Sequence, residues 1–339
     1  MSQTPRKSKV FKLKNQFHGL PKEADVNLIE EIVPAIKEGE FLAEAVYVSV
    51  DPYVRGLIST INPGDTIFGS QVARIIESKS KDYPVGKHVV GEFGWQTLSI
   101  GKNEINKIGF PAPWIIPDIG NLPLSLALGV LGMPGNTAYF GETEVCKLKE
   151  GEVFVVTGAG GAVGSHVGQI AKLKGCKVIG IAGSDEKGRW ITKDLGFDHF
   201  INYKTSNVAE KLAEYAPDGV DCFFDNVGGE ISSTIIYQMK KFGRVCICGS
   251  ISTYNNDSGD LPKAPEIQTP IKMKCVTMGA IRVLDYKDRW LEGINQNLQW
   301  IKEGKLKYRE TITNGFENTF NAFVSMLQGG NIGKAIVKV

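Results

Sequence analysis

The chain has 339 residues, of which 42% are hydrophobic and 22% are charged, and its net charge is +2. This length favours two domains, and the composition excludes a disordered chain. The near balance of acidic and basic residues argues against a nucleic-acid partner, which would need a concentrated basic surface. The first basic residues along the chain are Arg6, Lys7 and Lys9, and we interpret them as a solvated tail.

The first thirty residues contain no apolar segment of the signal-peptide type, and no run of about 18 apolar residues occurs. We therefore expect a cytoplasmic protein without a membrane partner. Scattered cysteines in such a protein are expected to be free, buried thiols. Neither the cysteines nor the four histidines have the spacing of metal ligands, so we expect no metal site. His166 is interpreted as a surface or helix residue.

The first part of the chain alternates apolar and polar residues in the segments Glu40–Ser49 and Ser70–Ser78. This alternation is typical of half-buried antiparallel strands, and His88–Phe93 follows as a third candidate. Glycine and proline are frequent in the connecting segments. The pattern predicts a β-rich N-terminal domain of the barrel type over residues 1–131.

The residue pattern changes within Asn121–Tyr139, where small residues predict a helical stretch. After it, apolar strands alternate with helical segments, which is typical of a parallel doubly wound α/β sheet over residues 132–299. A helix at Asn318–Leu327 and a strand at Lys334–Val339 follow. We expect residues 300–339 to complete the N-terminal domain. The predicted strands of the α/β sheet are Val153–Thr157, Lys177–Ile181, Cys222–Asp225, Arg244–Cys248 and the run over 275–281.

A glycine-rich turn joins the strand Val153–Thr157 to the next helix, with Gly158, Gly161 and Gly164 at its key positions. Such a turn lets a pyrophosphate approach the backbone and face the amino end of a helix. Because a strand precedes the turn and a helix and second strand follow it, the pattern predicts a dinucleotide site.

The end of the second strand indicates which dinucleotide binds. An acidic residue there would favour NAD, but the strand ends in Ala182 and Gly183, with Lys187 shortly afterwards. Small and basic residues at this place favour NADP. A capping role for Lys187 at a solvated helix start remains an alternative.

Taken together, the motifs resemble the zinc-free prostaglandin reductases, also called leukotriene hydroxydehydrogenases or alkenal/one oxidoreductases, of the medium-chain dehydrogenase/reductase superfamily. The similarity runs almost from end to end and implies a GroES-like catalytic domain with an inserted Rossmann domain. It also implies a homodimer. The matching motifs include Val50–Arg55, Gly132–Gly141, Gly183–Lys187, Asn202–Lys204, Phe224–Gly229 and Cys248–Asn255.

The resemblance also implies cofactor contacts. Lys187 and Tyr203 match positions that hold the adenosine phosphate of NADPH, Asn226 one near its diphosphate, and Asn331 a further polar contact. The segment Gly279–Val283 departs from the more aromatic run of mammalian members, so the shape of the substrate pocket is expected to differ. The implied cofactor residues are Gly161, Ala162, Val163, Gly164, Lys187, Tyr203, Asn226, Cys248, Gly249, Ser250, Ile251, Ser252, Thr253, Tyr254, Ala280, Ile281, Arg282 and Asn331.

The activity implied by the resemblance is NADPH-dependent reduction of the double bond in α,β-unsaturated ketones and aldehydes. Negative charge then develops on the carbonyl oxygen, which needs a hydrogen-bond donor. Tyr254 follows a predicted parallel strand and matches the family tyrosine for this role, although it could instead be a loop aromatic that supports the cofactor. Tyr53 is a candidate for substrate binding, but Asp51-Pro52 could equally form only a turn, and Arg55 has the same standing. A quinone reductase and a catalytically silent NADPH-binding protein remain alternatives.

Overall fold

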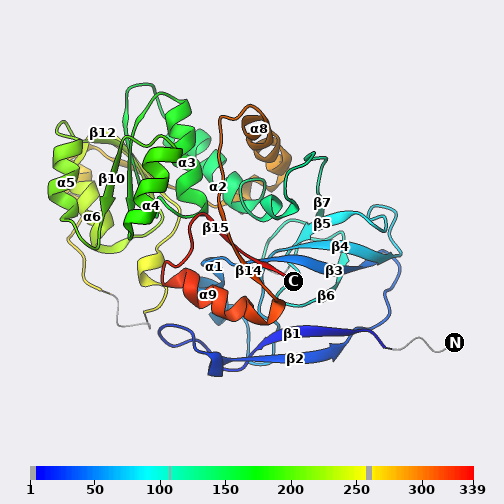
Figure 1. The fold of residues 1–339 in the computed structure, drawn as a ribbon. Helices are drawn as coiled ribbons and strands as arrows, with labels where there is room; N and C mark the ends of the chain where they lie inside the picture. The colour runs from blue at the N-terminus through cyan, green and yellow to red at the C-terminus, as the bar shows by residue number, and fades with distance from the viewer. Residues whose placement is uncertain (1–4, 107, 257–261) are drawn as a thin grey trace. The chain divides into compact units, whose positions relative to one another are not determined.

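The computed structural model describes residues 5–106, 108–256 and 262–339. The chain forms two compact units, Met1–Leu128 with Glu310–Val339, and Gly129–Arg309 (Figure 1). The sequence had suggested divisions after residues 131 and 299, whereas the units divide after residues 128 and 309. The first unit is therefore built from both ends of the chain.

The first unit contains a seven-stranded sheet in the order β14-β15-β3-β4-β5-β7, with β6 also paired to β3. The C-terminal strand β15 pairs antiparallel with β3, with Val337 opposite Val48. This pairing makes the C-terminal strand part of the sheet of the first unit. The strands are β3 Glu40–Ser49, β4 Gln71–Ser78, β5 His88–Gly91, β6 Leu98–Lys102, β7 Trp114–Ile115, β14 Glu310–Asn314 and β15 Lys334–Lys338; the helices are α1 Tyr53–Leu57 and α9 Thr319–Leu327.

A separate two-stranded sheet stands at the start of the chain. It consists of β1 (Lys7–Leu13) and β2 (Val26–Ile32), which are antiparallel. The prediction of a solvated tail at this place is wrong, because Lys7 and Lys9 are the exposed positions of β1 and Ser8 between them is buried. The Lys7 ammonium lies 3.1 Å from a carboxylate oxygen of Glu30 on β2. The basic residues are thus the outer face of a strand.

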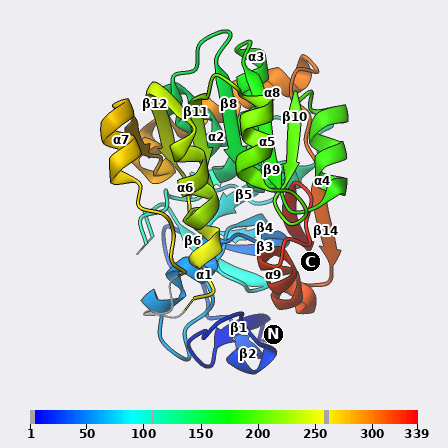
Figure 2. The ribbon, with the colours of Figure 1, turned by 90° about the vertical axis from the view of Figure 1, so that its left-hand side faces the viewer.

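The second unit contains a six-stranded parallel sheet in the order β10-β9-β8-β11-β12-β13. Strand order reverses between β8 and β11, and ligands bind such sheets at the carboxyl ends of the strands beside this point. In Figure 2, α5 and α6 lie in front of the strands. The strands are β8 Val153–Thr157, β9 Lys177–Ala182, β10 His199–Asn202, β11 Val220–Asp225, β12 Met239–Ile247 and β13 Thr277–Ala280; the helices are α2 Met133–Phe140, α3 Ala162–Leu173, α4 Asp185–Arg189, α5 Val208–Tyr215, α6 Gly229–Tyr237, α7 Gln268–Lys274 and α8 Trp290–Lys302.

The interior of this sheet explains its near-continuous apolar strands. Val155, Ile179, Phe223 and Val245 come from four neighbouring strands and are at most 1% exposed. Strands covered by helices on both faces need apolar residues at nearly every position. His166 on α3 is also buried, at 2% exposure, so it lies in a helix as expected but not at the surface.

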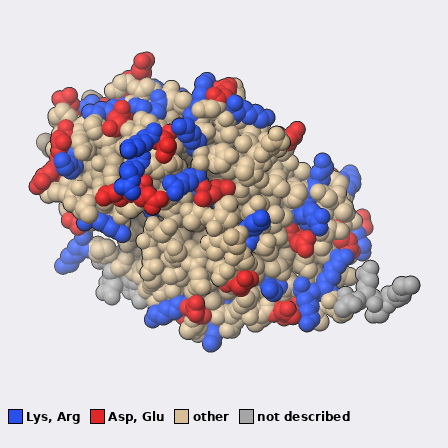
Figure 3. All heavy atoms as spheres, viewed as in Figure 1, with Lys and Arg blue, Asp and Glu red and all other residues tan. Residues whose placement is uncertain are grey.

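Charged residues of both signs are interspersed on the face shown in Figure 3, where lysines and arginines lie beside aspartates and glutamates. Among the described residues, none of the helices is long and apolar enough to cross a membrane.

Candidate functional site

The glycine-rich turn between β8 and α3 leaves no room for a side chain at Gly164 and little room at Gly161. Gly158 has a φ of +63°, a conformation that favours glycine. A Cβ atom on Gly164 would lie 2.3 Å from the Gly158 carbonyl oxygen, and one on Gly161 would lie 3.2 Å from the same atom. The first turn of α3, with Ala162 and Val163, therefore packs directly against the end of β8. Its free amide groups and helix dipole favour an anion at this end.

Lys187 lies over the glycine-rich turn. A Cβ atom on Gly160 would be 2.8 Å from Cγ and Cδ of the Lys187 side chain. Ser184 caps α4 and accepts a hydrogen bond from the Lys187 amide at 3.3 Å, which fixes the start of the helix. Burial lowers the pKa of the Lys187 ammonium, the nearby charge of Lys204 lowers it further, and Glu186 opposes the shift. Two mutually repelling cations are stabilised by a bound anion such as a phosphate.

Tyr203 completes this corner of the sheet. A Cβ atom on Gly183 would lie 2.9 Å from the Tyr203 hydroxyl, so the phenol covers the tip of β9. The Tyr203 side chain is 44% exposed. Asn202 donates a hydrogen bond to Asp185 at 2.7 Å, which joins the end of β10 to α4. Lys187 and Tyr203, the two residues that the resemblance assigned to the adenosine phosphate, therefore both lie near the end of β9.

Asn226 is held in a turn organised by Asp225, which the sequence analysis did not single out. One Asp225 carboxylate oxygen accepts hydrogen bonds of 3.0 Å from the Thr157 hydroxyl and from the amides of Val227 and Gly228. The Asn226 amide group donates to the Thr157 carbonyl at 2.7 Å. This network places Asn226 beside the glycine-rich turn. The one signal in the sequence was an acidic residue at the end of an apolar strand.

The loop over residues 248–254 is bonded to the same turn. The amides of Cys248 and Gly249 donate to the Asp225 carbonyl at 2.8 and 3.1 Å. Ser252 donates to the Val227 carbonyl from its amide at 3.1 Å and from its hydroxyl at 2.6 Å. The loop contains a short 3-10 helix over Ile251–Thr253. This loop, whose residues the resemblance assigned to the cofactor, is thus fixed to the Asp225 turn.

Tyr254 ends this loop and lies back over it. A Cβ atom on Gly249 would be 3.2 Å from the Tyr254 hydroxyl. Burial raises the pKa of the Tyr254 phenol, a hydrogen bond with the Ser250 backbone lowers it, and Cys248 raises it. The net shift is upward, so the hydroxyl keeps its proton at neutral pH and can act as a donor.

Three predicted residues, the last residue of β13 and the two that follow it, separate into buried and exposed positions. The Ile281 amide donates to the Ile247 carbonyl at 2.9 Å, and its side chain is 6% exposed. Ala280 is exposed. The Arg282 side chain is 69% exposed and lies 3.6 Å from Asp285. Of the three, Ile281 alone is part of the interior.

The remaining predicted residues belong to the first unit. Tyr53 is the first residue of α1, and Pro52 is its N-cap, so Asp51-Pro52 leads into a helix. The Tyr53 hydroxyl donates to both carboxylate oxygens of Glu92, at 3.0 and 3.1 Å. Arg55 is 8% exposed and donates to the Gly19 carbonyl, in the segment between β1 and β2, at 3.1 Å, which is a structural contact. Nothing in the sequence pattern had indicated Glu92.

Asn331 follows α9 and donates a hydrogen bond from its side chain to the Gly333 carbonyl at 2.7 Å. This bond shapes the turn into β15. Because this hydrogen bond stays within one short segment, a role of Asn331 toward the cofactor stays a prediction.

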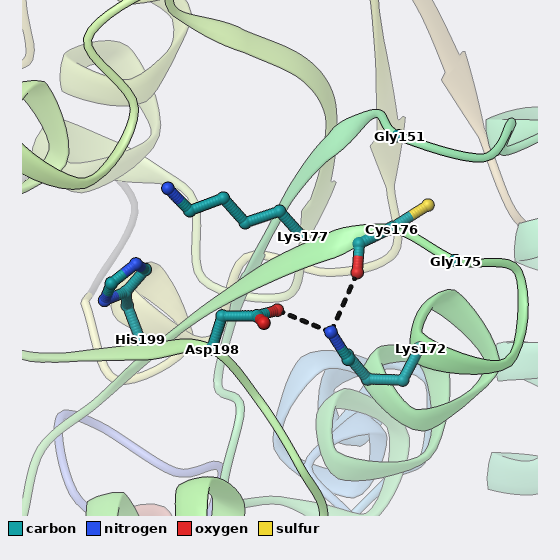
Figure 4. Close-up of a pocket in the computed structure, with 7 residues that line it drawn as sticks. All are labelled: Gly151, Lys172, Gly175, Cys176, Lys177, Asp198 and His199. Carbon is teal, nitrogen blue, oxygen red and sulfur yellow. Dashed lines mark hydrogen bonds and ion pairs between the residues drawn. The ribbon is translucent and has the colours of Figure 1, made fainter.

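A polar pocket opens at the other end of the parallel sheet (Figure 4). It lies where β9 and β10 begin, whereas the glycine-rich turn lies at the carboxyl ends of the strands. Lys172 bridges it, with its ammonium 2.7 Å from Asp198 and 3.0 Å from the Cys176 carbonyl. No residue predicted for the site is among those that line it. They are Gly151, Lys172, Gly175, Cys176, Lys177, Asp198 and His199.

Side chains that could hold a metal are dispersed. Within the described ranges, no three His, Cys, Asp or Glu residues form a group. Four of the six cysteines are buried and free, whereas Cys248 is half-buried and Cys275 is exposed. The expectation of buried thiols is therefore wrong for Cys275, which ends α7 with a φ of +51°.

Known proteins resemble this chain over nearly its full length. Residues 9–107 match a family described as the N-terminal domain of oxidoreductase, and residues 162–295 match a family described as zinc-binding dehydrogenase. Prostaglandin reductase 1 from Bos taurus is 49% identical, over 98% of this chain and 99% of the relative. The NADPH-dependent curcumin reductase of Escherichia coli is 38% identical, over 100% and 99%.

Among solved structures, CurA from Vibrio vulnificus in complex with NADPH is similar, with a TM-score of 0.89 and 36% identity. The similarity covers 98% of this chain and 99% of that one. The fold is therefore shared with a protein whose solved structure is a complex with NADPH.

Proposed function

Since this chain belongs to the zinc-free prostaglandin reductase family of NADPH-dependent oxidoreductases, we propose that it reduces the carbon–carbon double bond of α,β-unsaturated ketones and aldehydes. Lipid-derived alkenals and 15-oxo-prostaglandins are the substrate classes that we favour. The observation that carries the proposal is the set of Lys187, Lys204 and Tyr203 near the end of β9, with Lys187 lying over a glycine-rich turn that admits no side chain at Gly164.

The residues present fit NADPH. The glycine-rich turn and the start of α3 would receive the diphosphate, because glycine leaves the backbone accessible and the helix end favours an anion. Lys187 and Tyr203 would hold the adenosine phosphate, which would relieve the repulsion between Lys187 and Lys204. Asn226 and the loop over residues 248–254 would contact the remainder, as would Ala280, Ile281 and Arg282. When bound, NADPH supplies the hydride.

Tyr254 is the residue that we propose to stabilise the reaction. Its raised pKa keeps the phenol neutral, so its hydroxyl can donate a hydrogen bond to the carbonyl oxygen as that oxygen becomes negative. The orientation of the substrate would follow from the same bond. Tyr53 is proposed to line the substrate pocket, and Asn331 to add a polar contact.

The exposed edge of the parallel sheet supports a further part of the proposal. In the sheet order, β13 is a terminal strand, and Thr277 and Ala280 on it are exposed. An unpaired edge can continue a sheet with the same strand of a second copy. We propose a homodimer through this edge, and a cytoplasmic location; sedimentation of the purified protein would test the former.

The proposed activity is tested by NADPH consumption with a medium-chain alkenal, a 15-oxo-prostaglandin and a quinone, and by NADP reduction with a saturated alcohol. Mass spectrometry should show that the alkene has gained two hydrogens and that the carbonyl is intact. Tyr254→Phe should lower kcat by roughly 10- to 100-fold and leave NADPH affinity nearly unchanged. Turnover of the quinone alone would indicate a quinone reductase. NADPH binding without any turnover would indicate a silent binding protein.

A further inference from the structure

Asp225, the last residue of β11, is a buried acid at the carboxyl edge of the parallel sheet. It is 4% exposed. One oxygen of its carboxyl group accepts three hydrogen bonds, and the other accepts one from the Ser232 hydroxyl. A group that only accepts hydrogen bonds is a carboxylate, and hydroxyl and amide donors stabilise it without cancelling its charge. The three donors to the first oxygen are Thr157, Val227 and Gly228.

The charge of Asp225 acts on the loop that follows β12. The amides of Cys248 and Gly249 donate to the Asp225 carbonyl at 2.8 and 3.1 Å, so the carboxylate and the loop belong to one hydrogen-bonded turn. Burial raises the pKa of the Cys248 thiol, and Cys246 and the Asp225 charge raise it further. A negative charge is therefore fixed directly beside the loop over residues 248–254.

The order of the strands indicates which half of a bound dinucleotide is nearer to Asp225. In the sheet, β9 lies on one side of β8, and β11 and β12 lie on the other. The glycine-rich turn follows β8, and Lys187 and Tyr203 lie near the end of β9. A dinucleotide with its diphosphate at this turn and its adenosine half toward β9 extends its nicotinamide half over the ends of β11 and β12.

We infer that the Asp225 carboxylate stabilises the oxidised cofactor relative to NADPH and so makes bound NADPH a stronger hydride donor. The inference rests on the proposed function for the placement of the cofactor, but not for the identity of the substrate. Giving up a hydride leaves one positive charge on the nicotinamide ring, while the enone gains the electron pair and then a proton from water. A fixed negative charge in a poorly solvated site favours the state with that positive charge. Asp225 acts through its charge, without contact with the substrate.

One substitution separates this charge from the hydrogen bonds that shape the turn. In Asp225→Asn, the amide oxygen can accept the three bonds of the first carboxylate oxygen, and the NH₂ group can donate to the Ser232 hydroxyl. The charge is lost and the turn is kept. If Asp225 were merely structural, this variant would bind NADP and NADPH as the wild type does, or would bind both more weakly by the same factor.

The test measures Kd for NADPH and for NADP by calorimetry, with the wild type and Asp225→Asn. Any repulsion between Asp225 and the diphosphate is the same for both cofactors, so the ratio of the two Kd values reports the ring charge. Kd for NADP relative to Kd for NADPH should rise by roughly 3- to 10-fold in Asp225→Asn. A tenfold rise corresponds to a midpoint potential of the bound couple about 30 mV higher, which a redox titration measures independently.

Asp221→Asn is the matched control. Asp221 lies at the amino end of the same strand, where its carboxylate accepts the Val153 amide and the Lys240 ammonium, both at 2.8 Å. This charge is paired and lies at the opposite edge of the sheet, so the variant should keep the wild-type ratio. A control ligand is 2′-phospho-ADP-ribose, which lacks the nicotinamide. Its Kd should change in Asp225→Asn by the same factor as Kd for NADPH.

The outcomes separate the two proposals. If the wild type binds neither NADPH nor NADP, the proposed function fails and the inference falls with it. If it binds both but Asp225→Asn keeps the wild-type ratio, or Asp221→Asn shifts the ratio equally, only the inference is overturned. The expected ratio in a protein that reduces no enone would support the inference and refute the proposed activity. If Asp225→Asn does not fold, Asp225→Ser decides, and a wild-type ratio in that variant would overturn the inference.

Discussion

The ammonium nitrogen of Lys334 lies 3.0 Å from a carboxylate oxygen of Asp51, and both side chains are at most 6% exposed. Lys334 also donates to the carbonyls of Val50 and Ala335, at 2.7 and 3.0 Å. Ser49 donates to Asp51 from its hydroxyl. This pair joins the C-terminal strand β15 to the segment that precedes Tyr53.

Breaking this pair is expected to destabilise the first unit strongly. Lys334→Met leaves the Asp51 carboxylate buried without its cation, which typically costs about 3–5 kcal/mol. The free energy of unfolding in urea measures the effect. The double variant Asp51→Asn/Lys334→Met should recover part of the loss, because neither charge then remains. A double variant as unstable as the sum of both single variants would contradict this account.

Lys187 is expected to determine the preference for NADPH. Lys187→Ala removes a charge that lies over the glycine-rich turn, so Kd for NADPH should rise by roughly 10- to 100-fold. Kd for NADH, which lacks the phosphate, should change little. Lys193→Ala, at an exposed position just beyond α4, is the control and should leave both values unchanged. Quenching of protein fluorescence by each cofactor provides the measurement, and an equal loss for both cofactors would refute the phosphate role.

Gly164 is expected to tolerate no side chain. In Gly164→Ala, the new Cβ atom would meet the Gly158 carbonyl oxygen at 2.3 Å, and the backbone would have to move. Overpacking of this kind typically costs about 1–3 kcal/mol, and NADPH affinity should fall with it. Gly161→Ala offers a graded control, because its closest contact would be 3.2 Å. Thermal unfolding with and without NADPH should therefore rank Gly164→Ala well below Gly161→Ala.

The extent to which the sequence predicts the fold depends on how directly a pattern reflects burial. β3 and β8 have the predicted bounds, because the alternation of Glu40–Ser49 and the apolar run of Val153–Thr157 each report which faces are covered. β1 was missed since its lysines occupy the exposed positions of the strand. Charge at alternate positions there suggested a tail rather than one face of a hairpin.

For the candidate site, local motifs predicted the glycine-rich turn and the corner around Lys187. They did not indicate Asp225 or Glu92, whose roles arise from neighbours distant in the chain. Asp225 accepts a hydrogen bond from the Thr157 hydroxyl at 3.0 Å, and Glu92 accepts one from the Tyr53 hydroxyl at 3.0 Å. Such contacts depend on strand order, which a single sequence specifies only weakly.

His166 is expected to make the protein sensitive to acid. Its ring is buried on α3, its Nε2 atom lies 3.1 Å from Asn297 on α8, and burial lowers its pKa to about 4. Between pH 6.5 and about 4, the unfolded chain binds a proton at this histidine that the folded protein does not. The contribution of His166 to stability is therefore fully present above the pKa of the histidine in the unfolded chain, and it is lost as the pH falls toward about 4.

The contribution of His166 can be isolated with one substitution and urea unfolding at two pH values. On going from pH 7 to pH 5, His166 should account for a loss of roughly 2 kcal/mol in the wild type. His166→Gln has no group to titrate there, so its loss should be smaller by that amount. If His166→Gln and the wild type lose equal stability, the ring is protonated in the folded protein, and the Asn297 contact must then be a hydrogen bond donated by a charged imidazolium.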